Sequence, residues 1–176
     1  MAKRDGTPVE TALRQADMAM YWGLNFSGRQ ISDPKLALRI LDILTRASFP
    51  PDRLMIEVTE SAVVQRLEDA KATLQELRDV GVRIALDDFG TGYSGLYHLR
   101  ELELDTIKID RTFVGQMLEK PQEARIVKAI VSLGHAPGLK TTAEGIQSED
   151  MVGRLLKLGC DTGQGYCSDS LSPPRS

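Results

Sequence analysis

Acidic and amide side chains recur along this sequence at the points where short apolar stretches end. Asn25, Glu57, Asp87, Asp88 and Glu144 share this placement. Oxygen ligands without histidine or cysteine favour Mg²⁺, Mn²⁺ or Ca²⁺ over zinc. Crowded carboxylates repel one another unless a cation neutralises them, and adjacent Asp87 and Asp88 could serve two ions about 3.5–4 Å apart. The pattern predicts a divalent-metal site suited to activating water against a phosphodiester.

Lys108 and Gln164 occupy the same kind of position. A lysine there could orient the attacking water or stabilise phosphoryl charge, and it could equally form a structural ion pair with a buried carboxylate. Both roles remain open. Capping of the next helix would explain any single polar residue after a strand, but capping would favour Ser, Thr and Asn over Glu and Lys.

Alternating strands and helices must position these residues. Predicted strands cover residues 24–26, 54–58, 82–86, 105–109, 139–143 and 160–165. Predicted helices cover residues 7–22, 67–80, 93–100, 121–135 and 148–158. A further predicted helix begins at Asp33 and carries an apolar stripe of Leu36, Ile40, Ile43 and Leu44. Strands about 20–35 residues apart with helices between them are typical of parallel βα units.

About six parallel strands suit either a doubly wound sheet or an incomplete eight-stranded barrel. The sequence contains no Walker loop, which weakens the alternative of a doubly wound nucleotide-binding sheet. In a parallel barrel the carboxyl ends of the strands open into one mouth, so the polar residues from six strands are expected to meet there.

Composition narrows the class of protein. The formal net charge is −3 over 176 residues, and no basic block stands out, so we do not expect a nucleic acid polymer as partner. No apolar run approaches the roughly 20 residues that span a bilayer. Cys160 and Cys167 form no CxxC pair and His98 and His135 stand alone, so a zinc site is not predicted and a reducing cytoplasm is the expected location.

Six short motifs carry a resemblance to a known family. The sequence Asp-Asp-Phe-Gly-Thr-Gly-Tyr-Ser at 87–94 resembles the DDFGTGYS loop of EAL domains, and Glu-Val-Thr-Glu at 57–60, Lys-Ile-Asp at 108–110, Ala-Glu-Gly at 143–145, Gly-Cys-Asp at 159–161 and Gln-Gly-Tyr at 164–166 resemble further motifs of that family in the same order. The resemblance covers roughly residues 25–166.

The resemblance implies an α/β fold, an incomplete (β/α)8 TIM-type barrel, in a bacterial signalling domain that hydrolyses cyclic-di-GMP to linear pGpG with Mg²⁺ or Mn²⁺. It implies Asn25, Glu57, Asp87, Asp88 and Glu144 as metal ligands, and Lys108, Glu57 and Asp87 as catalytic residues. It implies Gln164 and Asp110 as substrate-binding residues. It implies Glu60 as the anchor of the loop after Phe89, and in the family this loop couples the site to dimerisation.

The sequence departs from the family in one main respect. The tripeptide Glu-Ala-Leu, which supplies a metal-binding glutamate in the family, occurs nowhere in this chain. Residues 15–21 instead resemble the last helix of a GGDEF domain. We therefore expect a GGDEF-like helix at 1–22, a truncated EAL-type barrel at 23–167 and a disordered tail at 168–176.

Two functions follow from this departure. One is a phosphodiesterase that is impaired or inactive as this chain alone. The other is a non-catalytic cyclic-di-GMP receptor or dimerising scaffold. In either case an incomplete barrel is expected to form a homo-oligomer or to bind a partner that completes it, because open strand edges invite pairing with another chain.

Overall fold

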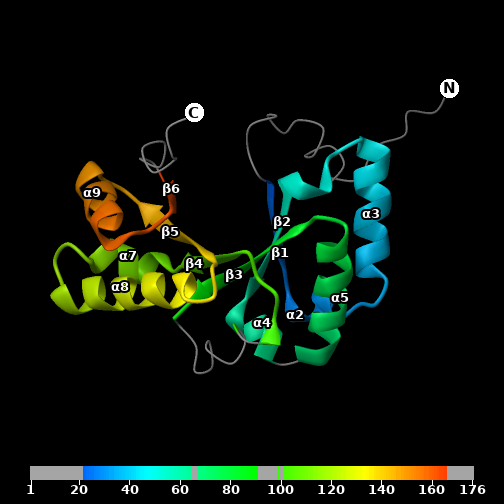
Figure 1. The fold of residues 1–176 in the computed structure, drawn as a ribbon, viewed down its shortest axis with the longest axis horizontal. Coiled ribbons are helices and arrows are strands. Elements are labelled where there is room, and N and C mark those ends of the chain that lie inside the picture. The colour runs from blue at the N-terminus through cyan, green and yellow to red at the C-terminus, as the bar shows by residue number, and fades with distance from the viewer. Residues whose placement is uncertain (1–21, 65–66, 91–98, 100, 166–176) are drawn as a thin grey trace. The chain divides into compact units, whose positions relative to one another are not determined.

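The computed structural model describes residues 22–64, 67–90, 99 and 101–165 (Figure 1). The chain divides into two compact units, Met1–Ile84 and Ala85–Ser176. The first contains β1 (Trp22–Phe26), α2 (Gly28–Ile31), α3 (Leu36–Ala47), the 3₁₀ turn η1 (Pro51–Arg53), β2 (Leu54–Thr59), α4 (Glu60–Val64) and α5 (Leu67–Asp79). The second contains β4 (Thr106–Ile109), α7 (Arg111–Gln116), α8 (Pro121–His135), β5 (Lys140–Ile146), α9 (Glu149–Leu158) and β6 (Thr162–Gly165), and β3 (Arg83–Phe89) leads into it.

Apolar spacing explains the helices of the first unit. On α3 the side chains of Leu36, Ile40 and Leu44 are buried, as the i, i+4 stripe in the sequence predicts. This helix packs against α5, whose buried side chains include Leu74 and Leu77 (Figure 1). The two helices thereby provide the apolar layer of this unit.

Strands β1 and β2 pair in parallel in the first unit. Asn25 lies opposite Glu57 in the register of this pair. Ile56 and Val58 of β2 are fully buried, so this strand lies in the core. The pairing therefore brings two of the predicted site residues side by side.

In the second unit the strand order follows the chain. Strand β3 pairs with β4, β4 with β5, and β5 with β6, all in parallel. Helix α8 contacts β4 and β5, and its buried side chains include Val127, Ile130 and Val131. A strand order without reversal is the pattern of a barrel, whereas doubly wound sheets reverse it at a switch point.

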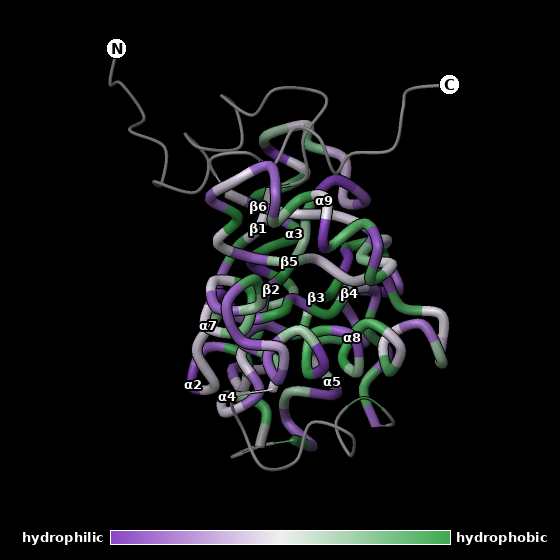
Figure 2. Tube along the Cα trace, turned by 90° about the vertical axis from the view of Figure 1, so that its left-hand side faces the viewer, coloured by the Kyte–Doolittle hydropathy of each residue, from purple (hydrophilic) through white to green (hydrophobic). Residues whose placement is uncertain are grey.

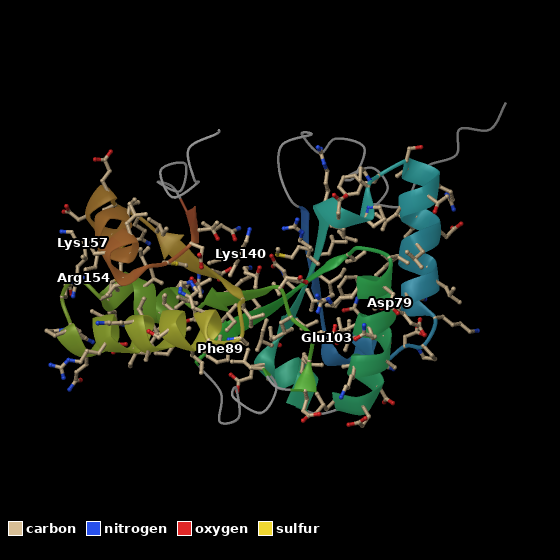
Figure 3. The ribbon with its side chains drawn as sticks, viewed as in Figure 1. Asp79, Phe89, Glu103, Lys140, Arg154 and Lys157 are labelled. Atoms are coloured by element: carbon tan, nitrogen blue, oxygen red, sulfur yellow. The ribbon has the colours of Figure 1, made fainter. Side chains whose placement is uncertain are left out.

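The helices of the second unit are amphipathic. Helix α9 begins at the N-cap Ser148, ends at the left-handed Gly159 (φ +85°) and buries Met151, Val152 and Leu155. Its charged side chains Arg154 and Lys157 lie on the outer side of the helix (Figure 3). The tube in Figure 2 accordingly changes between purple and green along its helical segments.

The observed elements confirm an α/β fold with six parallel strands among the described residues. The predicted helices at 67–80, 121–135 and 148–158 match α5, α8 and α9, and each predicted strand overlaps an observed one. The short helices α2, α4 and α7 were not predicted, because four to six residues give too little periodicity. The helix that Asp33 was expected to open begins at Leu36, since Asp33 instead accepts a hydrogen bond from the Lys35 backbone nitrogen at 2.9 Å.

The predicted helices at 7–22 and 93–100 and the tail at 168–176 lie outside the described residues, apart from isolated positions. The three-part domain division therefore stays a prediction. None of the helices that the structure describes is long and apolar enough to cross a membrane.

Candidate metal centre

All seven predicted site residues from the polar pattern lie within strands. They occupy the carboxyl-terminal half of their strands rather than the positions after them: Asn25 in β1, Glu57 in β2, Asp87 and Asp88 in β3, Lys108 in β4, Glu144 in β5 and Gln164 in β6. A residue inside a strand does not cap the following helix. The placement therefore argues against helix capping as the reason for these polar residues.

In the first unit Asn25 and Glu57 form a direct pair. The Asn25 side-chain amide donates a hydrogen bond from Nδ2 to Glu57 Oε2 at 3.1 Å. Glu57 is 8% exposed. A donating Nδ2 fixes which way the amide faces, so the pair holds two oxygen-bearing side chains in a defined orientation.

Glu60 begins α4 directly after β2 and is buried, with 3% exposure. The loop that it is predicted to anchor, residues 91–98, lies outside the described residues. Its anchoring role therefore stays a prediction.

Lys108 is the central cation of the second unit. Its Nζ lies 2.5 Å from Glu144 Oε1 and 3.5 Å from Asp87 Oδ1, and Lys108 is only 5% exposed. The structural ion pair that the sequence left open is thus present. Two carboxylates hold the buried ammonium group in place, and they offset the cost of burying an unpaired charge.

Three carboxylates converge in this unit. Asp87, Asp88 and Glu144 each present an oxygen within 4.8 Å of the other two. In the β5–β6 register Glu144 lies opposite Gln164, which is exposed. Strands β3, β4, β5 and β6 therefore each contribute to one end of this sheet.

Asp88 has an unusual backbone conformation. Its φ is +55°, in the left-handed region, and its backbone N–H donates to Asp87 Oδ1 at 3.0 Å. The register between β3 and β4 shifts at this point, between Leu86 and Phe89. Aspartate tolerates this region better than most residues, and such outliers cluster at functional sites. The irregularity lets consecutive residues both contribute carboxylates to the cluster.

Crowding affects the acidity of the carboxyl groups. Burial raises the pKa of Asp88, and the negative charges of Asp87 and Asp110 raise it further, whereas Lys108 acts to lower it. Burial also acts to raise the pKa of Asp110, but hydrogen bonds from Thr112 and Asp88 outweigh it and leave this pKa lowered. The Asp110 side chain accepts the Thr112 N–H at 2.8 Å and so caps α7.

The donor set fits a hard divalent cation. It consists of carboxylate oxygens, and neither histidine nor cysteine belongs to the cluster. Within it, burial and the neighbouring charge of Asp87 raise the pKa of Asp88. Such sites select Mg²⁺, Mn²⁺ or Ca²⁺. The chemistry of the residues therefore agrees with the metals expected from the sequence.

A family model for the EAL domain matches residues 9–170. The chain belongs to the EAL domain family. Among curated relatives, this EAL domain is 34% identical over 161 residues to the cyclic di-GMP phosphodiesterase RocR of Pseudomonas aeruginosa, with 92% of the chain and 41% of RocR covered.

Solved structures show the same fold. The c-di-GMP complex of the PaMucR phosphodiesterase superposes with a TM-score of 0.81 at 35% identity, covering 90% of this chain and 64% of that one. A manganese and cyclic-di-GMP complex of Klebsiella pneumoniae BlrP1 gives a TM-score of 0.81 at 28% identity, covering 90% of this chain and 41% of that one. These likenesses confirm the barrel class over the doubly wound alternative. The chain spans about a fifth of the length of several other curated relatives.

The structure contains a polar network that the sequence did not predict, because no partner for His135 was expected. The structure pairs His135 Nε2 with Asp161 Oδ2 at 2.8 Å. The same oxygen accepts the Thr141 N–H at 2.8 Å and the Thr141 hydroxyl at 2.7 Å. Thr141 lies near the start of β5 and Asp161 directly before β6, so this network joins the amino-terminal ends of the two strands to the end of α8.

Proposed function

We propose that this EAL domain is a metal-dependent phosphodiesterase module for cyclic-di-GMP, which it hydrolyses to linear pGpG, and that the chain alone is impaired. The observation that carries the proposal is the cluster of Asp87, Asp88 and Glu144 within 4.8 Å, with the buried Lys108 ion-paired to two of its members. The names of RocR and of the PaMucR complex point to the same substrate.

Asp87, Asp88 and Glu144 would hold Mg²⁺ or Mn²⁺, which when bound supplies charge neutralisation at the phosphate and a more acidic water. The ligand roles of Asn25 and Glu57 and the substrate-side roles of Gln164 and Asp110 belong to the proposal and rest on the family resemblance. Asp110 is well suited to support the cluster, since it shares a hydrogen bond with Asp88 and caps α7.

Lys108 would orient the attacking water and stabilise negative charge on the phosphoryl oxygens. Its two ion pairs restrain the ammonium group, and an electrostatic group that is fixed before the reaction needs no reorganisation during it. The structural and the catalytic roles of this lysine are therefore compatible.

Impairment follows from the missing glutamate. The tripeptide Glu-Ala-Leu is absent from this sequence. In a two-metal site the clamp on the attacking and the leaving oxygen depends on both ions being fixed, so a lost ligand lowers turnover more than it lowers metal binding. A homo-oligomer or a partner that completes the barrel is part of the same proposal.

A non-catalytic cyclic-di-GMP receptor or scaffold is the second candidate. The observation in its favour is that Lys108 already compensates the charges of Asp87 and Glu144 without a metal. A cytoplasmic location also belongs to the proposal, and the buried free thiol of Cys160 agrees with a reducing compartment.

The test is a turnover assay with Mg²⁺ and Mn²⁺, alongside calorimetric titration of Mn²⁺ and of cyclic-di-GMP. We expect Mn²⁺ to bind, and turnover to fall below the ordinary enzyme range of about 1–10³ s⁻¹. Asp87→Asn should weaken Mn²⁺ binding, and the exposed Asp42→Asn serves as control. Turnover of the unmodified chain within the ordinary enzyme range, together with loss of turnover in Glu57→Ala, would contradict the proposed impairment. Cyclic-di-GMP binding with no turnover, even after addition of a barrel-completing segment, would favour the receptor.

A further inference from the structure

Gly23 lies on β1 beneath the carboxylate of Glu57. A Cβ atom built at Gly23 would overlap Glu57 Oε1 and would lie 2.9 Å from Glu57 Cδ. Real Cβ atoms essentially never approach other heavy atoms this closely. The Glu57 carboxylate thus occupies the space that a side chain at position 23 would fill.

The strand register explains the contact. Gly23 and Asn25 are two residues apart and face the same side of the sheet, opposite Met55 and Glu57 of β2. Glu57 reaches back over Gly23 while its Oε2 accepts the Asn25 amide at 3.1 Å. Both carboxylate oxygens are therefore close to β1: Oε1 lies above the Cα of Gly23, and Oε2 accepts the hydrogen bond from Asn25.

Backbone conformation gives no reason for a glycine here. The glycines with positive φ in the described residues are Gly81, Gly90, Gly138, Gly145, Gly159 and Gly165, so position 23 has a conformation that any residue adopts. Glycine inside a strand weakens the strand, and it often marks a site of close approach. The close approach at Gly23 is the Glu57 carboxylate.

We propose that Gly23 is a positioning residue for the metal ligands of the first unit. By leaving its side of the sheet open, it lets Glu57 lie over β1 and keeps the hydrogen bond that orients the Asn25 amide. The inference rests on the proposed function, in which Glu57 and Asn25 are ligands. A side chain at position 23 would displace the Glu57 carboxylate and release Asn25 with it.

Thermal unfolding of a double-mutant cycle tests the placement without any metal. With Glu57 present, Gly23→Ala should lower the Tm by about 2–4 °C, because the new methyl group meets the carboxylate. In the Glu57→Ala background the same change should leave the Tm unchanged or raise it, since alanine loses less backbone freedom on folding. An equal effect in both backgrounds would overturn the proposal.

Titration of Mn²⁺ tests the positioning role. Gly23→Ala should weaken Mn²⁺ binding about tenfold, the order expected when support for a ligand is lost, and it should have no further effect in the Glu57→Ala background. Gly153→Ala on α9 is the matched control, because a Cβ there meets nothing within 4 Å, and it should leave the affinity unchanged.

The outcomes separate this inference from the proposed function. Unchanged Mn²⁺ affinity in Gly23→Ala would overturn the positioning role while the proposed function stands. Absence of Mn²⁺ binding in the unmodified chain would overturn both. A Tm cycle without coupling would overturn the placement of Glu57 over Gly23, whatever the chain does with metal or cyclic-di-GMP.

Discussion

Lys108 is the residue on which the charge balance of the second unit depends. It is 5% exposed and its Nζ contacts carboxylates from two different strands, at 2.5 Å and 3.5 Å. Removing one partner of a buried ion pair leaves the other charge without compensation, which costs more than the pair itself contributes. The carboxylates would then need another cation.

Replacing Lys108 by methionine should lower the free energy of unfolding by about 3–5 kcal/mol, because Asp87 and Glu144 lose their shared cation. Added Mn²⁺ should recover part of this loss by taking the place of the ammonium charge. Urea unfolding with and without Mn²⁺ measures both effects. Lys128→Met on the exposed side of α8 is the control and should change the stability by less than about 0.5 kcal/mol. Equal losses for the two variants would contradict the argument.

Asp161 belongs to a separate polar network and has its own pH dependence. Burial, the largest influence, acts to raise its pKa, but hydrogen bonds from His135 and Thr141 outweigh it and hold the pKa below the usual 3.8. A lowered carboxyl pKa stabilises the folded state above the unfolded-state pKa, and this contribution is lost as the pH falls through the folded-state value.

Asp161→Asn should therefore lower the free energy of unfolding by about 1 kcal/mol at pH 7, since charge-assisted hydrogen bonds are lost but solvent screens this partly exposed carboxylate. The difference from the parent chain should shrink below about pH 4, where the parent carboxylate becomes protonated as well. Chemical unfolding at a series of pH values gives the comparison. A difference that stays constant down to pH 2 would show that the carboxylate charge is not responsible.

Among the elements, the helix ends show most directly how local sequence fixes structure. Helix α5 ends at Asp79, and Gly81 follows with φ +97°. A Cβ at Gly81 would meet only the Asp52 backbone nitrogen, at 3.9 Å. Space is therefore available there, and the backbone conformation alone demands glycine.

Gly81→Ala should lower the free energy of unfolding by about 1–2 kcal/mol, the cost of a left-handed conformation for a residue with a Cβ. Gly115→Ala in α7 is the matched control, because a Cβ there meets nothing within 4 Å and alanine favours the helix. The control should be neutral or stabilising. Thermal unfolding of both variants measures the effect. A similar loss of stability in the two variants would show that the left-handed conformation of Gly81 is not the cause.

For the molecule as a whole, the edges of the sheet matter most. Among the described residues β1 pairs only with β2, and β6 only with β5. Exposed large apolar side chains include Leu38 on α3, Leu118 in the turn after α7 and Leu156 on α9. Open strand edges and exposed apolar side chains favour association with another chain.

We expect light scattering coupled to size-exclusion chromatography to show a dimer or larger species at tens of micromolar. Leu156→Glu on α9 and Leu38→Glu on α3 test the apolar positions one at a time, since both side chains are more than half exposed. A strictly monomeric chain that binds no dye for exposed apolar surface would contradict this expectation.

The sequence by itself determined the order of the elements, the polar residue on each strand and the family. Helices α5, α8 and α9 were predictable because apolar spacing and end signals agree over ten residues or more. The candidate ligands were predictable because side chains near the carboxyl ends of parallel strands meet, whatever the details of packing.

The tertiary structure alone decided which of these side chains contact one another. Pairing of Lys108 with both Asp87 and Glu144 depends on the register of three strands, which no local signal encodes. The His135–Asp161 contact joins residues 26 positions apart through the packing of α8. The role of Gly23 depends on the Glu57 side chain, which lies over it only once β1 and β2 have paired. Such contacts join residues that are far apart in the sequence. The periodicity of the sequence indicates which face of an element a residue occupies, but not which residue of another element it contacts.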